Sequence, residues 1–170
     1  MIPAAPEHSL KTFYTTLGAA LLFTLYTSSS LPDVVASHFN SAGAATGFLP
    51  RRAYTVLATL MLLLPALLLV QLPRQTLRKP NARINLPNAR YWLAPQRREQ
   101  TVAIITRSCA QLAQLLVIFL CYAHWLLVHA NHTVPPTLSS TWLIGGLVVF
   151  LGLTVAGSGR LIARFYSIEE

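Results

Sequence analysis

Charged residues are scarce in this chain of 170 residues. They make up 11% of the sequence, whereas 54% of the residues are apolar and the mean hydropathy is +0.51. A water-soluble domain carries roughly 25% charged residues, so this chain has too little charge to cover a water-facing surface. The shortage argues against a soluble domain, a disordered chain and a nucleic-acid-binding module. It predicts an integral membrane protein, with one membrane domain over residues 1–170.

Acidic residues and cysteines are rarer still. Five acids stand against 13 Lys and Arg residues, and Asp33 is the single acid between Glu7 and Glu99. Two-carboxylate chemistry therefore lacks its residues, and the sequence has neither a phosphate-binding glycine loop nor an HExxH motif. Cys109 and Cys121 make no metal-finger spacing. We therefore expect a protein that is not an enzyme.

Long apolar segments are what the sequence has instead. They cover residues 10–30, 53–72, 104–129 and 139–159. Each is close to the about 20 residues that cross a hydrocarbon core as a helix. The sequence predicts an all-α integral membrane protein, a bundle of four transmembrane helices with a structured outer loop and an interfacial cytoplasmic link. Pro65 lies inside the second segment and is expected to kink it.

The positions of the basic residues predict an orientation. The N-terminus, the link between the second and third segments, and the C-terminal tail contain Lys11, Arg74, Arg78, Lys79, Arg83, Arg90, Arg97, Arg98, Arg160 and Arg164. Arg51 and Arg52 lie on the other side. Because cytoplasmic loops retain Lys and Arg, both termini and the link should be cytoplasmic, and loops 31–52 and 130–138 should face outward. The net charge of +8 is then explained by topology beside anionic lipid, and no nucleic-acid partner is expected.

Two patterns lie within the apolar segments. Gly152 and Ala156 have the four-residue spacing of close helix contacts, which indicates packing within the bundle or a homodimer interface. In the third segment a polar stripe falls within about 80° of the helix surface at ~100° per residue. Its residues are Arg107, Gln111, Gln114, Cys121, His129 and His132. The stripe is either the face turned into the bundle or a polar track for a proton, ion or peptide.

The outer loop contains candidate binding residues. They are Asp33, His38, Asn40 and Gly43. In an extended segment His38 and Asn40 point to one side, where imidazole and carboxamide could bind a metal, a lipid headgroup or a peptide backbone, or could hydrogen-bond the loop to helix ends. With His129 and His132 at the same membrane face, His38 also makes a candidate zinc or copper site. No other cofactor is expected.

The cytoplasmic link contains a second candidate site. Its residues are Asn85, Asn88, Arg90, Tyr91, Trp92, Arg97 and Arg98. Tyr91 and Trp92 have the amphipathic rings that favour a membrane–water boundary, beside Arg90 for phosphate contact. The segment is therefore either an interfacial anchor or a docking surface for a cytoplasmic partner.

These two motifs together resemble a known family. Leu31-Pro32, Val35, His38-Phe39-Asn40, Gly43 and Gly47 are similar to the bacterial membrane family called domain of unknown function 1648. The runs Asn85-Leu86-Pro87-Asn88 and Tyr91-Trp92-Leu93-Ala94-Pro95, followed by Arg97-Arg98-Glu99, resemble a second stretch of the same proteins, so that the motif region covers about residues 10–107. The same domain forms the N-terminal part of SdpI-like toxin-immunity proteins.

The resemblance implies a helical protein of the bacterial inner membrane without established catalytic activity. We therefore predict a non-enzymatic binding or accessory protein, acting in peptide-toxin immunity, in sensing, or as a subunit of a larger membrane complex. The alternative hypothesis is a metal-binding or ion- or proton-handling protein that uses the outward-facing histidines. The expected partners are the lipid bilayer and a membrane or cytoplasmic protein.

Overall fold

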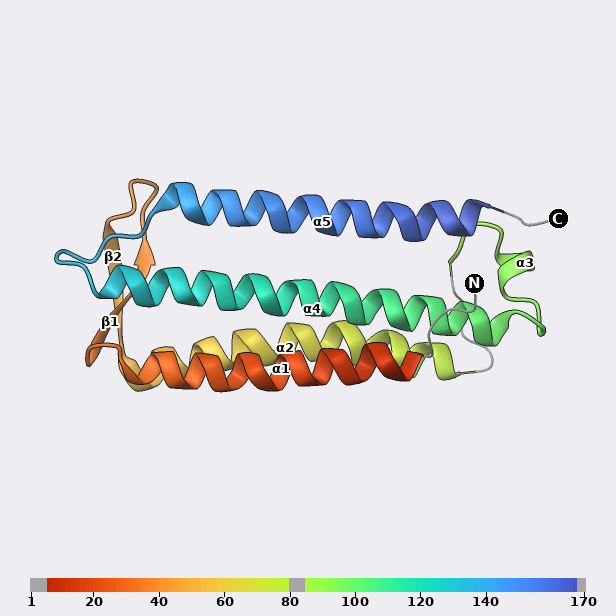
Figure 1. Cartoon of the computed structure of the whole chain (residues 1–170), viewed down its shortest axis with the longest axis horizontal. Helices are drawn as coiled ribbons and strands as arrows, with labels where there is room; N and C mark the ends of the chain where they lie inside the picture. The colour runs from red at the N-terminus through yellow and green to blue at the C-terminus, as the bar shows by residue number, and fades with distance from the viewer. Residues whose placement is uncertain (1–5, 80–84, 168–170) are drawn as a thin grey trace.

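The computed structural model describes residues 6–79 and 85–167, which form a bundle of long helices with a small hairpin at one end. The elements are α1 (Pro6–Ser29), β1 (Val34–Phe39), β2 (Ala45–Pro50), α2 (Arg51–Arg78), α3 (Ala89–Trp92), α4 (Arg98–Asn131) and α5 (Ser140–Tyr166). The helices α1, α2, α4 and α5 lie side by side along the long axis (Figure 1). We call the end with β1 and β2 the hairpin end, and the end with α3 the link end.

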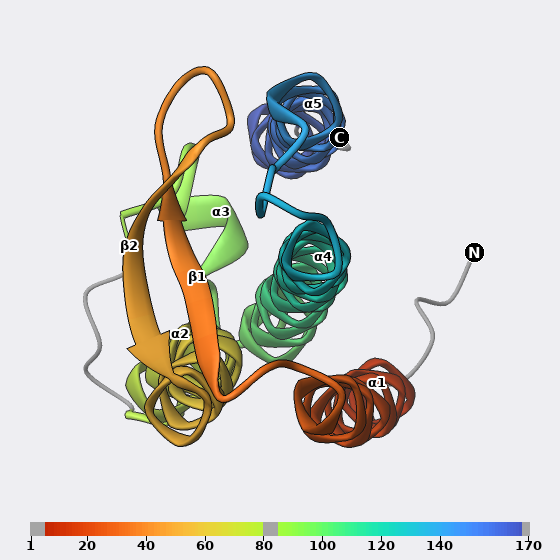
Figure 2. The ribbon, with the colours of Figure 1, turned by 90° about the vertical axis from the view of Figure 1, so that its left-hand side faces the viewer.

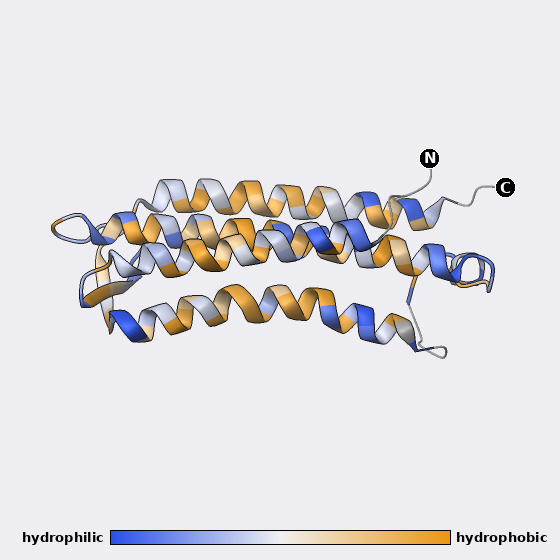
Figure 3. Ribbon diagram, turned by 60° about the horizontal axis from the view of Figure 1, so that its bottom comes forward, coloured by the Kyte–Doolittle hydropathy of each residue, from blue (hydrophilic) through white to orange (hydrophobic). Residues whose placement is uncertain are grey.

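Among the described residues, three helices are long and apolar enough to cross a membrane. They cover Arg51–Leu77, Arg98–Asn131 and Ser140–Tyr166, so the predicted helical membrane protein is confirmed for three of the four expected segments. The remaining segment is helical as α1, but Lys11 and its many Thr, Ser and Tyr residues lower its hydropathy. The hydropathy colouring in Figure 3 shows apolar stretches along the helices and polar residues concentrated toward the ends.

The main core lies where α1 and α2 pack against α4. Ala110 and Ala113 of α4 are almost completely buried there, together with Val117. Small side chains let helix backbones approach closely in an apolar medium, and the other buried residues of this core come from the neighbouring helices. These are Phe13, Leu17 and Ala20 of α1, and Leu62, Ala66 and Val70 of α2.

The helix α2 continues without a break through two prolines. Pro65 and Pro73 both lie inside Arg51–Arg78, and the axis of α2 bows gently in Figure 3. Each proline removes one backbone hydrogen bond, which accounts for a bend and not for an end of the helix. The kink that the sequence predicts at Pro65 is therefore replaced by a gentle curvature of α2.

The structured outer loop is a two-stranded antiparallel sheet. The pairs include Val35 with Leu49, Ala36 with Phe48, and Phe39 with Ala45. The register shifts on both sides of His38, so the alternation expected for an extended segment is interrupted there. Seen from the hairpin end, β1 lies between β2 and α4 (Figure 2).

The last helix, α5, packs mainly on α4. No residue in its most apolar 18-residue stretch is buried. A methyl group added at Gly146 would collide with the ring of Tyr122. One added at Gly145 or Gly152 would have no described atom of another element within 4 Å. The interpretation that Gly152 serves packing within the bundle is therefore wrong, because that face of α5 is open.

The basic residues are distributed along the bundle as the sequence predicts. Arg51 and Arg52 begin α2 at the hairpin end, whereas α5 brings Arg160 and Arg164 to the link end. The other described basic residues of that set belong to the first turns of α1, the end of α2 and the link region. Arg83 and the side chain of Arg78 lie outside the described residues.

Candidate functional site

A salt bridge anchors the base of the hairpin. The guanidinium of Arg51 lies 3.0 Å from the carboxylate of Asp33 and also donates to the carbonyl of Leu31 at 2.9 Å. The Arg51 backbone N–H donates to the Asp33 carbonyl at 2.8 Å. Because Arg51 begins α2 and Leu31 follows α1, these bonds join two helix ends and include Asp33, the residue before β1. Asp33 thus has a partner within the chain.

Asn131, which the sequence analysis did not identify, holds the free edge of β1. Its Oδ1 accepts from the Ala36 N–H at 2.7 Å, and its Nδ2 donates to the Ala36 carbonyl at 3.0 Å. Nδ2 also donates to the Leu127 carbonyl in α4 at 2.9 Å. The carboxamide therefore occupies the position that a third strand would take beside β1. No single-segment pattern signals this role, because the partner lies 95 residues away.

The outer edge of β2 remains open. Both backbone groups of Ala36 bond to Asn131, so Ala36 and its partner Phe48 form a non-hydrogen-bonded pair of the ladder. The N–H and C=O of Phe48 therefore point away from β1. Figure 2 shows this edge of β2 on the side away from α4, and the Phe48 side chain is 56% exposed. Among the residues that the structure describes, nothing bonds to this edge, and the hairpin presents it beside an aromatic side chain.

The tip of the hairpin is fastened to the segment before α5. Asn40 organises the turn, since its Oδ1 accepts from the Ala44 N–H at 2.9 Å and its carbonyl accepts from the Gly43 N–H at 2.9 Å. Gly43 has a φ of +83°, and its carbonyl accepts from the Leu138 N–H at 2.9 Å. Asn40 therefore shapes the turn of the hairpin through hydrogen bonds within it, and Gly43 joins this turn to the segment before α5.

The candidate metal ligands are not brought together. His38 lies in β1, where its Nδ1 is 3.0 Å from the Ser37 hydroxyl. His129 stacks on Trp125 at a centroid distance of 6.0 Å, and His132 ends α4. Within residues 6–79 and 85–167 there is no group of three or more His, Cys, Asp or Glu residues that could hold a metal ion. The proposed zinc or copper site at His38, His129 and His132 is therefore not formed.

A different histidine, His124, joins three helices near the hairpin end. Its Nε2 lies 2.8 Å from the Thr27 hydroxyl in α1, and its Nδ1 lies 2.7 Å from the Tyr54 hydroxyl in α2. The ring also stacks on Tyr54 at 5.8 Å and meets the Phe23 ring edge-on at 6.1 Å. Both ring nitrogens are thus satisfied, as a polar group in an apolar bundle requires. This cluster fixes α1, α2 and α4 directly beneath the hairpin.

The link motif closes the C-terminal end of α5. The Asn88 amide donates to the carbonyls of Phe165 and Tyr166 at 3.2 and 3.1 Å, and the Trp92 indole N–H donates to Phe165 at 3.0 Å. The last carbonyls of a helix have no partner within it, so these donors cap α5. Trp92 is 8% exposed and packs edge-on against the Phe165 ring at 5.3 Å. The indole therefore faces protein.

The other residues of the link motif lie around this cap. The Arg97 guanidinium lies 3.6 Å above the centre of the Tyr91 ring, and Arg98 donates to the Lys79 carbonyl at 2.9 Å. Asn85 and Arg90 are exposed. The motif therefore joins the ends of α2, α4 and α5, and leaves Arg90 available to a lipid surface or a partner.

These features define a class before any family is considered: a helical membrane protein with a two-stranded hairpin at one end and a capped helix junction at the other. Residues 15–69 match the family described as Domain of unknown function (DUF1648). The match confirms the resemblance and covers most of α1, the hairpin and much of α2. It ends before the link motif. No curated protein and no solved structure matches the chain.

Proposed function

We propose that this protein is a non-enzymatic membrane protein that binds an extended peptide at the outer edge of β2. The observation that supports it is the geometry of the hairpin. Asn131 fills the edge of β1, and the Phe48 N–H and C=O point out from the opposite edge. An extended peptide adds to such an edge as a further strand, with main-chain hydrogen bonds giving affinity and alternate side chains giving specificity.

The hairpin is held in place before any peptide binds. An isolated two-stranded hairpin is only marginally stable in water. Here the bonds from Arg51 to the Asp33 and Leu31 carbonyls hold its base, Asn131 holds one edge and the Gly43–Leu138 bond holds its tip. Preorganisation of this kind reduces the ordering cost of association. Pro50 has no N–H and ends the available edge on one side, which favours a short bound segment.

The proposed placement has four spans in a bacterial inner membrane, with both termini inside and the hairpin outside. Its support is the excess of basic residues at the link end and the packing of α1 against α2 and α4. The peptide would then arrive from outside the cell, as immunity to a peptide toxin or sensing of one requires. The one acid between Glu7 and Glu99, Asp33, is engaged with Arg51, which supports a binding role over catalysis.

An accessory role within a larger complex is the second candidate. Its support is α5, whose apolar stretch has no buried residue, so that a membrane partner could pack there without displacing any part of the chain. Arg90 in the link offers a contact to a cytoplasmic partner. Purification from native membranes in a mild detergent tests this role, because a stoichiometric partner is expected and recovery of the chain alone contradicts it.

Selection of peptides on the purified protein tests peptide binding. The protein would be placed in lipid nanodiscs, and a random phage-displayed peptide library would be selected against it. Phe48→Pro removes the outward N–H without touching the β1–β2 ladder, since that N–H makes no bond to β1. Phe48→Thr is the matched control, because it removes the aromatic ring but keeps the N–H. The selected peptides should lose about tenfold or more in affinity to Phe48→Pro and much less to Phe48→Thr.

Two results would contradict the proposal. One is a selection that enriches no peptide above nanodiscs without protein. The other is a set of peptides that bind the wild type and Phe48→Pro equally well, since their binding would not use the β2 edge. Deletion in the parent bacterium tests the immunity role separately: the account expects greater sensitivity to a peptide toxin, and unchanged sensitivity would argue for sensing or for the accessory role.

A further inference from the structure

A groove runs along the contact between α4 and α5. Toward the hairpin end it is an apolar cavity of about 520 Å³, lined by residues such as Phe119, Phe150 and Leu153. It continues toward the link end as two cavities of about 380 and 340 Å³. Neighbouring cavities share lining residues, among them Leu115 and Leu153 in the apolar part. We call this continuous surface the α4–α5 groove.

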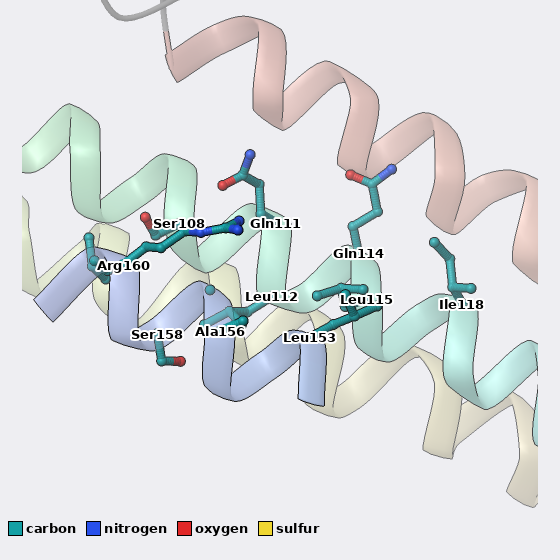
Figure 4. Close-up of a pocket in the computed structure, with 12 residues that line it drawn as sticks. Ser108, Gln111, Leu112, Gln114, Leu115, Ile118, Leu153, Ala156, Ser158 and Arg160 are labelled. Atoms are coloured by element: carbon teal, nitrogen blue, oxygen red, sulfur yellow. The ribbon is translucent and has the colours of Figure 1, made fainter. Parts of the chain in front are cut away.

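The link end of the α4–α5 groove is basic. Arg107 of α4 lines it together with Arg160 and Arg164, which are one turn apart on α5. Ser108 and Gln111 lie beside them, and Figure 4 shows the Arg160 side chain extending from α5 toward α4. Among the residues that the structure describes, no salt bridge or hydrogen bond involves the side chains of these three arginines. The salt bridge that these residues do form, Asp33–Arg51, lies at the hairpin end.

The basic residues lie at the depth of lipid headgroups. About 20 helical residues cross a hydrocarbon core, and that number counted from Ser140, the first residue of α5, reaches Gly159. Arg160 is therefore the first residue past the hydrocarbon region, and Arg164 lies one turn further toward the water. The groove thus changes from apolar to basic where a bilayer changes from acyl chain to phosphate.

We propose that the α4–α5 groove binds one anionic phospholipid of the leaflet at the link end. Its phosphate is held by Arg107, Arg160 and Arg164, and one acyl chain lies in the apolar cavity along Leu115 and Leu153. Guanidinium groups bind phosphate through paired, charge-assisted hydrogen bonds. A transmembrane helix of a partner would need acidic groups at the same depth, where they are costly, whereas a lipid supplies both the charge and the chain.

The occupied groove explains the weak packing of α5. Between the stacked rings of Phe119 and Phe150, 4.8 Å apart, and the cap at Phe165, α5 meets α4 across cavities. Unfilled space in a helix contact forfeits dispersion energy. A bound chain fills it, so we expect α5 to be more firmly attached when the lipid is present.

The test compares two lipids of identical acyl chains on the full chain purified in a neutral detergent. Phosphatidylglycerol is anionic and phosphatidylcholine is zwitterionic, and binding is measured by native mass spectrometry. The wild type should bind phosphatidylglycerol at least about tenfold more tightly. The double variant Arg160→Gln/Arg164→Gln should lose most of this preference. Arg74→Gln/Lys79→Gln is the matched control, because it removes two cations from the link end of α2, outside the groove, and should keep the preference.

A second variant tests the apolar part of the groove. Leu153→Trp fills the cavity and leaves all three arginines in place, so it should weaken phosphatidylglycerol binding at least about tenfold. Its elution volume and its thermal unfolding in lipid-free detergent should match those of the wild type, since residue 153 is half exposed. Inorganic phosphate, which has no chain, should not compete at concentrations that saturate the lipid site.

Several results would overturn the proposal. Equal binding of the two lipids would show that the arginines do not recognise an anionic headgroup. Equal loss in the groove and control variants would show attraction to net charge alone. Full competition by inorganic phosphate together with normal binding to Leu153→Trp would show an anion site without a chain. A dimer that Leu153→Trp dissociates would assign the groove to a second copy of the chain.

Discussion

At the residue scale, a few polar side chains determine how the apolar helices meet. Asn131 replaces a missing strand beside β1, and His124 bonds to Thr27 and Tyr54 across three helices. In each case both hydrogen-bonding sides of the group are satisfied, which is what makes a buried polar group stabilising. These polar contacts act together with the buried apolar cluster of Leu31, Val35, Tyr54 and Val128 at the hairpin end.

We expect Asn131→Ala to loosen the hairpin. The change leaves the Ala36 N–H and C=O without partners, which costs about 2 kcal/mol or more. Hydrogen exchange measured by mass spectrometry on the protein in detergent should rise over Val34–Phe39. Asn40→Ala is the control, because Asn40 contributes its side-chain bond only to the turn at Ala44. Unchanged exchange over β1 in Asn131→Ala would show that the carboxamide does not hold this edge.

The sequence alone predicted functional histidines from their positions along the chain. It selected His38, His129 and His132 because they share a membrane face, yet it missed His124, which is the buried one. The partners of His124 come from α1 and α2, and no periodicity within the third segment indicates which helices face it. The same limit applies to Asn131, because its partner in β1 is distant in the sequence.

At the element scale, the apolar runs predicted correctly where the long helices lie, but not the residues at which they end. The segment expected over 139–159 is the helix Ser140–Tyr166. Arg160 and Arg164 end a run of apolar residues, but Arg is a good helix former, so the helix continues. In the hairpin, the register shifts around His38 could not be predicted, because they depend on which residues of β2 pair with β1.

Two glycines with opposite environments provide a matched prediction. Gly43 has a φ of +83° and an added Cβ would collide with the Leu138 carbonyl, whereas Gly152 lies in α5 with open space around it. Gly43→Ala should destabilise the protein by at least about 1–2 kcal/mol through backbone strain alone. Gly152→Ala should be neutral or gain about 0.5–1 kcal/mol in helix propensity.

Thermal unfolding in detergent measures both glycine variants. The midpoint should fall for Gly43→Ala and stay level or rise for Gly152→Ala. A fall for Gly152→Ala would contradict the open environment of that face and would point to a contact with a second copy of the chain.

At the scale of the whole molecule, the bundle is polarised along its axis. The hairpin end offers a strand edge and pairs Arg51 with Asp33, and the link end collects most of the basic residues. Charge counting predicted this polarity from the sequence. Three helices are long and apolar enough to cross a membrane, while a fourth span at α1 stays a prediction.

The placement of the two ends across the membrane is the central claim, and cysteine labelling tests it most directly. In a background with Cys109→Ala and Cys121→Ala, single cysteines would be introduced by Thr46→Cys in β2 or Gln96→Cys in the link, both exposed positions. Intact bacterial cells would then be treated with a membrane-impermeant maleimide. The account predicts that Thr46→Cys is labelled in intact cells and Gln96→Cys only after permeabilisation. Labelling of Gln96→Cys in intact cells, with Thr46→Cys protected, would contradict it.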